Sequence, residues 1–232
     1  MGSNMKLLEA AKINDLESVK YWLEKGADLH SMNDSALRWA AYYGYLEIVK
    51  YLLEQGGDLH ADSDWALRLS ALNGHLEVVK FLLERGADLH ADDDQALEWA
   101  AEYDHLQVVN YLVEQGANLH AKNDYAFRLA ALYGHLEVVK YLLEQGGDSN
   151  LVSEEMLIKL FTSYDLKIAK DIPRLTSLLL KIDLVKKSYQ ISTRNKMLST
   201  YKKKVLTSLV VLMYHLYYRP SGPGFFQAIE AV

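Results

Sequence analysis

Residues 58–87 read DLHADSDWALRLSALNGHLEVVKFLLERGA, and the first part of the chain repeats this stretch with few changes. The repeat is marked by the triplet Gly-Ala-Asp or a close relative, which returns every 30 residues without insertion or deletion. The repeated glycines are Gly26, Gly56, Gly86, Gly116 and Gly146. A fixed period between about 20 and 50 residues is typical of stacked repeat proteins, in which neighbouring units share small cores.

Each unit predicts two helices and a polar connector. In residues 58–87 a first helix follows Asp64 and ends at Gly74, where a left-handed residue is needed. A second helix then runs to Gly86. The residues expected to face inward are Ala66, Leu67, Ser70 and Ala71 in the first helix and Leu76, Val79, Leu82 and Leu83 in the second.

An aspartate precedes the first helix of every full unit. Its carboxylate can accept the free amides of a first helical turn, so we predict that it acts as the N-cap. The four positions are Asp34, Asp64, Asp94 and Asp124. Asp104 stands where the other units have their turn glycine, and it tolerates that geometry at some cost.

These units resemble the ankyrin family. The resemblance lies in Gly-His-Leu-Glu-Val-Val-Lys at Gly74–Lys80 and Gly134–Lys140 and in Leu-Leu-Glu-x-Gly-Ala-Asp at Leu82–Asp88, and it covers residues 7–148. It implies an all-α solenoid of helix-turn-helix units. Because the family's usual unit has about 33 residues, we infer shortened connectors. The short period is similar to that of ankyrin proteins encoded by giant DNA viruses.

The chain is expected to have two parts. We expect a repeat stack over residues 5–172 and a basic helical region over residues 173–232 that caps the stack. The units lie near 5–27, 28–57, 58–87, 88–117 and 118–147, with a degenerate sixth over 148–172. Residues 1–150 carry 12 Lys and Arg against 25 Asp and Glu, whereas residues 151–232 carry 13 against 6. This shift of charge supports a boundary near residue 150.

The sequence lacks the residues that several kinds of catalytic and cofactor-binding site require. The chain has no cysteine, no Gly-rich phosphate loop and no His-Glu-x-x-His helix, so we expect no enzyme activity and no cofactor. Histidines recur at His30, His60, His90 and His120, but neighbouring repeats are about 10 Å apart, too far to share a metal ion. We therefore expect no metal site and assign these histidines to hydrogen bonds that tie the connectors together.

Two kinds of partner are also not expected. The acidic stack would repel phosphates, so we predict no nucleic-acid binding. The sequence has no run of 18 or more apolar residues, so we predict no ordinary transmembrane helix and no membrane partner. An intracellular location fits best, which for a viral protein is the host-cell cytoplasm.

The positions that vary between units point to function. Constant positions hold the stack together, so varying positions are free to serve another role. In ankyrin proteins the matching positions line the concave face, and here they carry residue types that dominate interface hot spots. The candidate partner-binding residues are Trp65, Tyr125, Arg38, Arg68, Arg128, Tyr42, Tyr43, Leu72, Tyr103, Leu132 and Tyr133. Trp39 and Trp99, which alternate with Leu69 and Leu129, are assigned to the core.

The sequence thus predicts a non-enzymatic module that binds a protein partner of unspecified identity through an aromatic concave face. We expect a monomer or a weak homo-oligomer. One alternative is an adaptor whose C-terminal helices recruit a second partner, such as a ubiquitin-ligase component, although residues 174–232 show no convincing F-box pattern. The other alternative is a structural protein that assembles with itself through the aromatic face.

Overall fold

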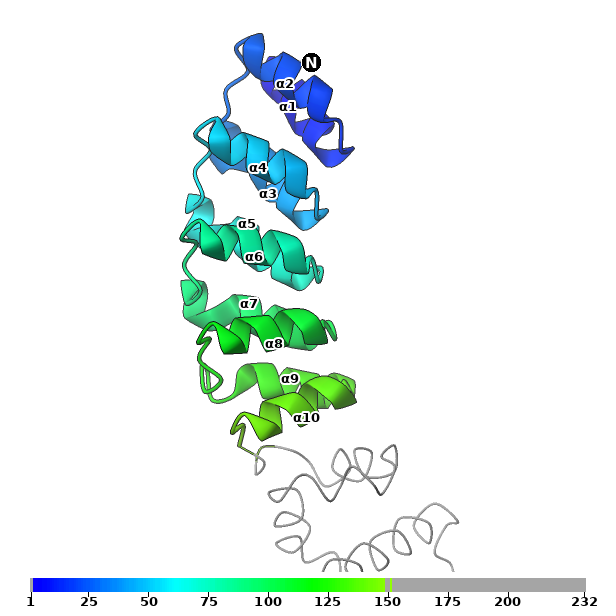
Figure 1. The fold of residues 1–232 in the computed structure, drawn as a ribbon, viewed down its shortest axis with the longest axis vertical. Coiled ribbons are helices and arrows are strands. Elements are labelled where there is room, and N and C mark those ends of the chain that lie inside the picture. Colours follow the sequence, from blue (N-terminus) through cyan, green and yellow to red (C-terminus); the bar gives the residue numbers. More distant parts are fainter. Residues whose placement is uncertain (1, 149–150, 152–232) are drawn as a thin grey trace, which may run out of the picture. The chain divides into compact units, whose positions relative to one another are not determined.

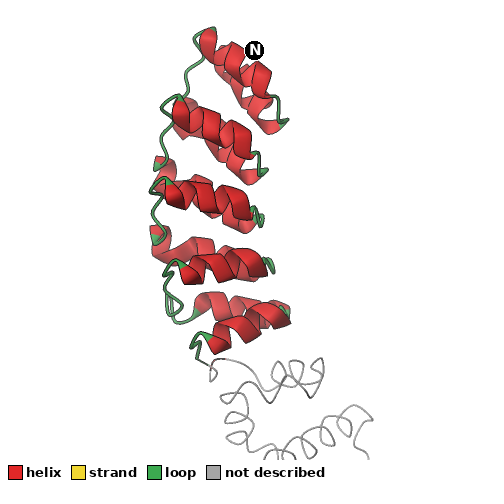
Figure 2. Ribbon diagram, viewed as in Figure 1, coloured by secondary structure: helices red, strands yellow, loops and turns green. Residues whose placement is uncertain are grey.

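A computed structural model of the chain describes residues 2–148 and 151. They belong to the first of two units into which the chain divides, Met1–Leu151 and Val152–Val232. The described residues form ten helices in five stacked pairs (Figure 1) and contain no strand (Figure 2). The predicted unit of two helices is therefore confirmed. The degenerate unit expected over 148–172 and the helical region expected over 173–232 lie outside the described residues.

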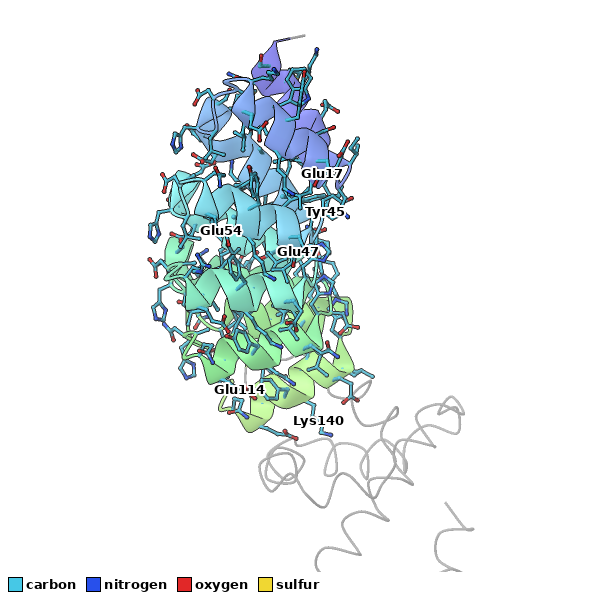
Figure 3. All side chains as sticks on the ribbon, turned by 45° about the horizontal axis from the view of Figure 1, so that its top comes forward. Glu17, Tyr45, Glu47, Glu54, Glu114 and Lys140 are labelled. Atoms are coloured by element: carbon cyan, nitrogen blue, oxygen red, sulfur yellow. The ribbon has the colours of Figure 1, made fainter. Side chains whose placement is uncertain are left out.

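Odd-numbered helices open the units and even-numbered helices close them. The helices are α1 Ser3–Lys12, α2 Leu16–Glu24, α3 Ser31–Tyr42, α4 Leu46–Glu54, α5 Ala61–Leu72, α6 Leu76–Glu84, α7 Ala91–Glu102, α8 Leu106–Glu114, α9 Tyr125–Tyr133 and α10 Leu136–Glu144. In Figure 3, Glu17 and Glu47 lie in the first turns of α2 and α4, and Glu54 and Glu114 mark the last residues of α4 and α8.

The two rows of helices pack differently. Odd-numbered helices lie in closer contact with one another than even-numbered helices do, and we call them the inner row. Small residues allow this approach: Ala40 and Ala100 are fully buried, and Ser70 is buried at the equivalent place, where its hydroxyl donates to the Leu67 carbonyl. The even-numbered helices, the outer row, bury Val and Leu such as Val79.

The turn between the two helices of a unit requires a left-handed residue. Gly44 and Gly74 have φ values of 77° and 73°. A Cβ atom added at either glycine would lie 2.5 Å from Nδ1 of His75 or His105, so the ring of the next unit occupies that space. Asp104 takes the same left-handed conformation, with φ 64°, as the sequence predicts.

Each full unit opens with a left-handed turn of three residues, which interrupts the start of α3, α5 and α7 within their bounds and directly precedes α9. The turns are Met32–Asp34, Asp62–Asp64, Asp92–Asp94 and Lys122–Asp124, and their φ values lie between 48° and 61°. Asn and Asp fill most of these positions because their short polar side chains tolerate this conformation. The acidic run Asp92–Asp94 is therefore explained by the backbone geometry of a shortened connector.

The predicted N-cap role of the repeated aspartates is wrong. The left-handed backbone directs the nearly buried carboxylate of Asp34, 3% exposed, toward the next connector. There it accepts the backbone N–H of Asp58, at 2.9 Å. The same bond joins Asp88 to Asp64, Asn118 to Asp94 and Asp148 to Asp124. These aspartates join successive units, and no capping bond is formed at the starts of α3, α5, α7 and α9.

Candidate functional site

The varying positions of the inner row lie on one face of each helix. They are spaced by three, four, seven and eight residues, which places them on one side of an α-helix. We call this surface the aromatic stripe. Its members are Trp39, Tyr42, Tyr43, Trp65, Leu69, Leu72, Trp99, Tyr103, Tyr125, Leu132 and Tyr133. All of these side chains are half-buried or exposed, whereas Leu129, which occupies the position of Trp39 in the fifth unit, is buried.

The core assignment made from the sequence is correct for one residue of four. Leu129 is 8% exposed, but Trp39, Leu69 and Trp99 are only half-buried. Their helix position lies at the edge of the contact between neighbouring inner helices. Small residues such as Ala40 fill the centre of that contact, so a large side chain at its edge extends onto the surface.

Four rings gather at the start of the aromatic stripe. Tyr43 stacks on Trp39 and on Tyr45, with ring centroids 5.7 and 5.6 Å apart. Tyr42 meets Trp39 and Tyr43 edge-on, at 5.2 and 5.0 Å. Lys12 lies 4.8 Å from the centroid of Trp39. Sequence analysis did not single out Tyr45, whose signal is that the later units have histidine at this position.

Trp65 and its neighbours form the centre of the stripe. The ring of Trp65 meets Trp99 edge-on at 5.5 Å, and the Arg68 guanidinium lies 4.4 Å from the Trp65 centroid. Arg68 is 4% exposed and donates hydrogen bonds to Asp92, to Gln95 and to the Asp62 carbonyl. Burial lowers the pKa of this guanidinium. Because Arg68 has almost no free surface, we exclude it from the proposed contact set.

The most exposed members lie next to the turns. Tyr43, Tyr103 and Tyr133 are 40%, 54% and 56% exposed, and Leu132 is 73% exposed. Ile13, which sequence analysis missed, occupies the equivalent position in the first unit and is 68% exposed. Counting back one period from Tyr43 would have found it.

Ion pairs between successive units flank the stripe. Arg38 donates to Asp62 and Arg68 donates to Asp92, each at 2.9 Å and across 24 residues. At the next junction the charges are exchanged, and Lys122 donates to Glu98 at 3.0 Å. The cationic group of Arg128, by contrast, lies over the Tyr125 ring at 5.7 Å and is exposed. Arg38, whose side chain is 20% exposed, retains some surface for a partner.

The histidines of the connectors contact carboxylates of their own units. Nδ1 of His30 donates to Asp34 at 3.0 Å, and this bond and the carboxylate's charge raise the pKa of His30. His60, His90 and His120 bind Asp64, Asp94 and Asp124 in the same way. Their roles are hydrogen bonds, but the bonds lie within one unit, and the adjoining aspartates make the links between connectors that we expected from the histidines.

A second set of histidines links the turns. Nε2 of His75 donates to the Tyr42 carbonyl at 2.9 Å, 33 residues earlier. His105 and His135 bind the carbonyls of Leu72 and Glu102 in the same way, at 2.9 and 2.7 Å. Burial lowers the pKa of His75. Within residues 2–148 no group of three or more His, Cys, Asp and Glu side chains is arranged to hold a metal ion.

Comparisons with known proteins identify the repeat. The chain matched no curated protein. In the part of the chain that the structure describes, no helix has the length and apolarity to cross a membrane. The family model described as "Ankyrin repeats (3 copies)" matches residues 7–93, 59–123 and 90–153. Since these matches together cover more than half of the chain, it belongs to the ankyrin-repeat family.

Proposed function

We propose that the chain is a non-enzymatic interaction module that binds a protein partner through the aromatic stripe, on the concave face of the stack. Ankyrin repeats are generally protein–protein interaction modules. The observation that carries the proposal is the exposure of Tyr43, Tyr103 and Tyr133, between 40% and 56%, at equivalent turns of one surface. Exposed aromatic side chains that recur on one surface are typical of a binding site.

The size of the stripe is sufficient for specific binding. A stable interface buries about 800 Å² on each partner, which one helix face cannot provide. The stripe extends over α3, α5, α7 and α9, and neighbouring inner helices are about 10 Å apart. Trp65 lies near its middle and Tyr125 near its end, so both would be covered by a partner that follows the row.

Capture of partners from cell extract tests the proposal. We would compare the full chain with the Trp65→Gln/Tyr125→Ser double variant. Gln95 and Ser35 occupy the same position in other units, so the stack accommodates these residues. Tyr21→Gln is the matched control, because Tyr21 is 49% exposed on the outer helix α2.

A partner that is lost with the double variant and retained with Tyr21→Gln supports binding through the stripe. Circular dichroism and thermal unfolding show that each variant keeps its fold. If mass spectrometry finds the same partner with all three proteins, or no specific partner with any, the stripe is not the binding surface.

The charge difference between the two parts favours a second role for residues 151–232, which carry 13 Lys and Arg against 6 Asp and Glu. We propose that they belong to an adaptor and recruit a second partner, such as a ubiquitin-ligase component. Truncation after residue 172 should then remove one class of captured proteins and keep the class bound by the stripe. The 30-residue period further leads us to propose the short-repeat ankyrin class of giant DNA viruses, acting in the host-cell cytoplasm.

A further inference from the structure

The end of α7 departs from the repeat in two places on the turn side of the stripe. Glu102 stands where the other full units have Tyr42, Leu72 and Leu132. Asp104 stands where they have Gly44, Gly74 and Gly134. Between these two carboxylates in the sequence is Tyr103, whose side chain is 54% exposed.

Both departures are locally unfavourable. Glu102 is the last residue of α7, where the negative end of the helix dipole opposes a carboxylate. Asp104 holds a φ of 64°, which glycine adopts without steric cost. The packing of the stack explains neither residue, because the other units are built without them.

Among the described residues, no Lys or Arg forms an ion pair with Glu102 or Asp104. Nδ1 of His135 lies 3.8 Å from the Asp104 carboxylate. Nε2 of the same ring donates to the Glu102 carbonyl at 2.7 Å, so His135 also holds the turn that carries Asp104.

Four acidic groups of the inner row and its connectors differ in this respect. Asp62, Asp92 and Glu98 are paired with Arg38, Arg68 and Lys122, and Glu9 is paired with Lys12. Glu102 and Asp104 lack such a partner, and they precede and follow the exposed Tyr103 in the sequence. The surrounding residues 1–150 are acidic as a whole, with 25 Asp and Glu against 12 Lys and Arg.

We propose that the partner of the aromatic stripe is a basic polypeptide segment, with an Arg or Lys side chain placed against Tyr103 between Glu102 and Asp104. This inference rests on the proposed function and specifies the chemistry of the partner. The Tyr103 ring attracts a cation through its π-face, and the two carboxylates add ion pairs at the rim. Apolar side chains of the segment cover Tyr43 and Tyr133 on either side.

The spacing of the helices sets the length of the segment. With about 10 Å between neighbouring inner helices, α3 and α9 are separated by roughly 30 Å. An extended chain spans about 3.3 Å per residue, so about nine or ten residues bridge the stripe. A library of random 12-residue peptides is therefore a suitable probe.

The test is a selection of displayed peptides on the immobilised full chain, beside two double variants. Glu102→Leu/Asp104→Gly removes both carboxylates and introduces residues that Leu72 and Gly74 supply in the preceding unit. Trp65→Gln/Tyr125→Ser removes aromatic surface. Glu77→Gln is the matched control, since it removes a carboxylate that is already paired with Lys80.

We expect the full chain and Glu77→Gln to select peptides that combine Arg or Lys with aromatic or aliphatic residues. The Glu102→Leu/Asp104→Gly variant should still select apolar peptides but lose the enrichment in Arg and Lys. A selected peptide should bind this variant about fivefold more weakly, the combined effect of two exposed ion pairs.

Two kinds of result overturn the inference, and they are distinguishable. If the full chain selects apolar peptides without Arg or Lys, or if the enrichment persists without Glu102 and Asp104, the basic segment is wrong while the stripe remains a binding surface. If the full chain selects no peptides, or if Trp65→Gln/Tyr125→Ser selects the same ones, the proposed function fails with it.

Discussion

Glu98 accepts a hydrogen bond from Lys122 of the next unit at 3.0 Å. At the two preceding junctions the charges are reversed: Arg38 and Arg68 occupy the position of Glu98, and Asp62 and Asp92 occupy the position of Lys122. Both members of the pair change sign together, so the attraction between the units is preserved. The exchange also makes this junction different from its neighbours. A unit that carries Glu98 fits a following unit that carries Lys122 and opposes one that carries Asp at that position.

Exchanging the charges one at a time should expose this dependence. Glu98→Arg places a second cation beside Lys122, and because the Glu98 side chain is only 13% exposed, we expect the free energy of unfolding to fall by about 1–2 kcal/mol. Adding Lys122→Asp recreates the pair found at the earlier junctions and should recover most of the loss. Urea denaturation of the single and double variants measures this coupling, and additive losses would show that the two residues do not interact.

The buried aspartates should be more important for stability than the exposed aspartates of the same turns. Asp64, which is 4% exposed, accepts the backbone N–H of Asp88 at 2.9 Å and Nδ1–H of His60 at 3.0 Å. Asp64→Asn replaces charge-assisted bonds by weaker neutral ones and should cost about 1–2 kcal/mol. Asp93→Asn, in an exposed left-handed position, is the control and should change little. Equal denaturation midpoints for both variants would contradict the linking role of Asp64.

The pKa values of His75 and His30 should depart in opposite directions from the ordinary histidine pKa of 6.5. Burial lowers the pKa of His75, so its contribution to stability is present above pH 6.5 and is lost as the pH falls through its folded-state pKa. The hydrogen bond to Asp34 raises the pKa of His30, so its contribution is present below pH 6.5 and is lost as the pH rises through its folded-state pKa. Ring-proton chemical shifts followed by NMR give both values, and a His75 pKa above that of His30 would refute the assignment.

Asp104→Gly should stabilise the stack. It relieves a left-handed aspartate at a turn where the other full units use glycine, so we expect the free energy of unfolding to rise by about 0.5–1 kcal/mol. Guanidinium denaturation provides the measurement. A loss of stability would mean that Asp104 has a structural task in the turn, which would remove one reason for assigning it to partner binding.

The periodic features of this protein were predictable from the sequence. Spacing and residue type predict the 30-residue period, the two helices of each unit and the left-handed turn at Gly74. Burial of most inward-facing residues was predictable for the same reason. Ala66, Leu67, Ser70, Ala71, Val79 and Leu82 are buried, whereas Leu76 and Leu83 are only half-buried. Each of these properties depends on residues within one unit, and its repetition strengthens the signal.

The directions of side chains between units were not predictable in this way. An N-cap role for Asp64 was a reasonable prediction from local rules, yet the left-handed backbone at Asp64 turns its carboxylate toward Asp88. Trp99 is a large apolar residue of the kind expected in a core, but the close approach of the inner helices leaves it half-buried at the surface, beside Trp65.

By itself, the sequence determined the repeat, its helices and its family resemblance, because these depend on local propensity and a fixed period. Only the tertiary structure decided which of the varying residues are exposed on the surface and which are buried in contacts between units. Arg38 and Arg68 occupy the same position in successive units, but the side chain of Arg38 is 20% exposed and that of Arg68 is 5% exposed. The difference arises because Trp65 and Gln95 contact Arg68, and contacts between units form only when the stack is assembled.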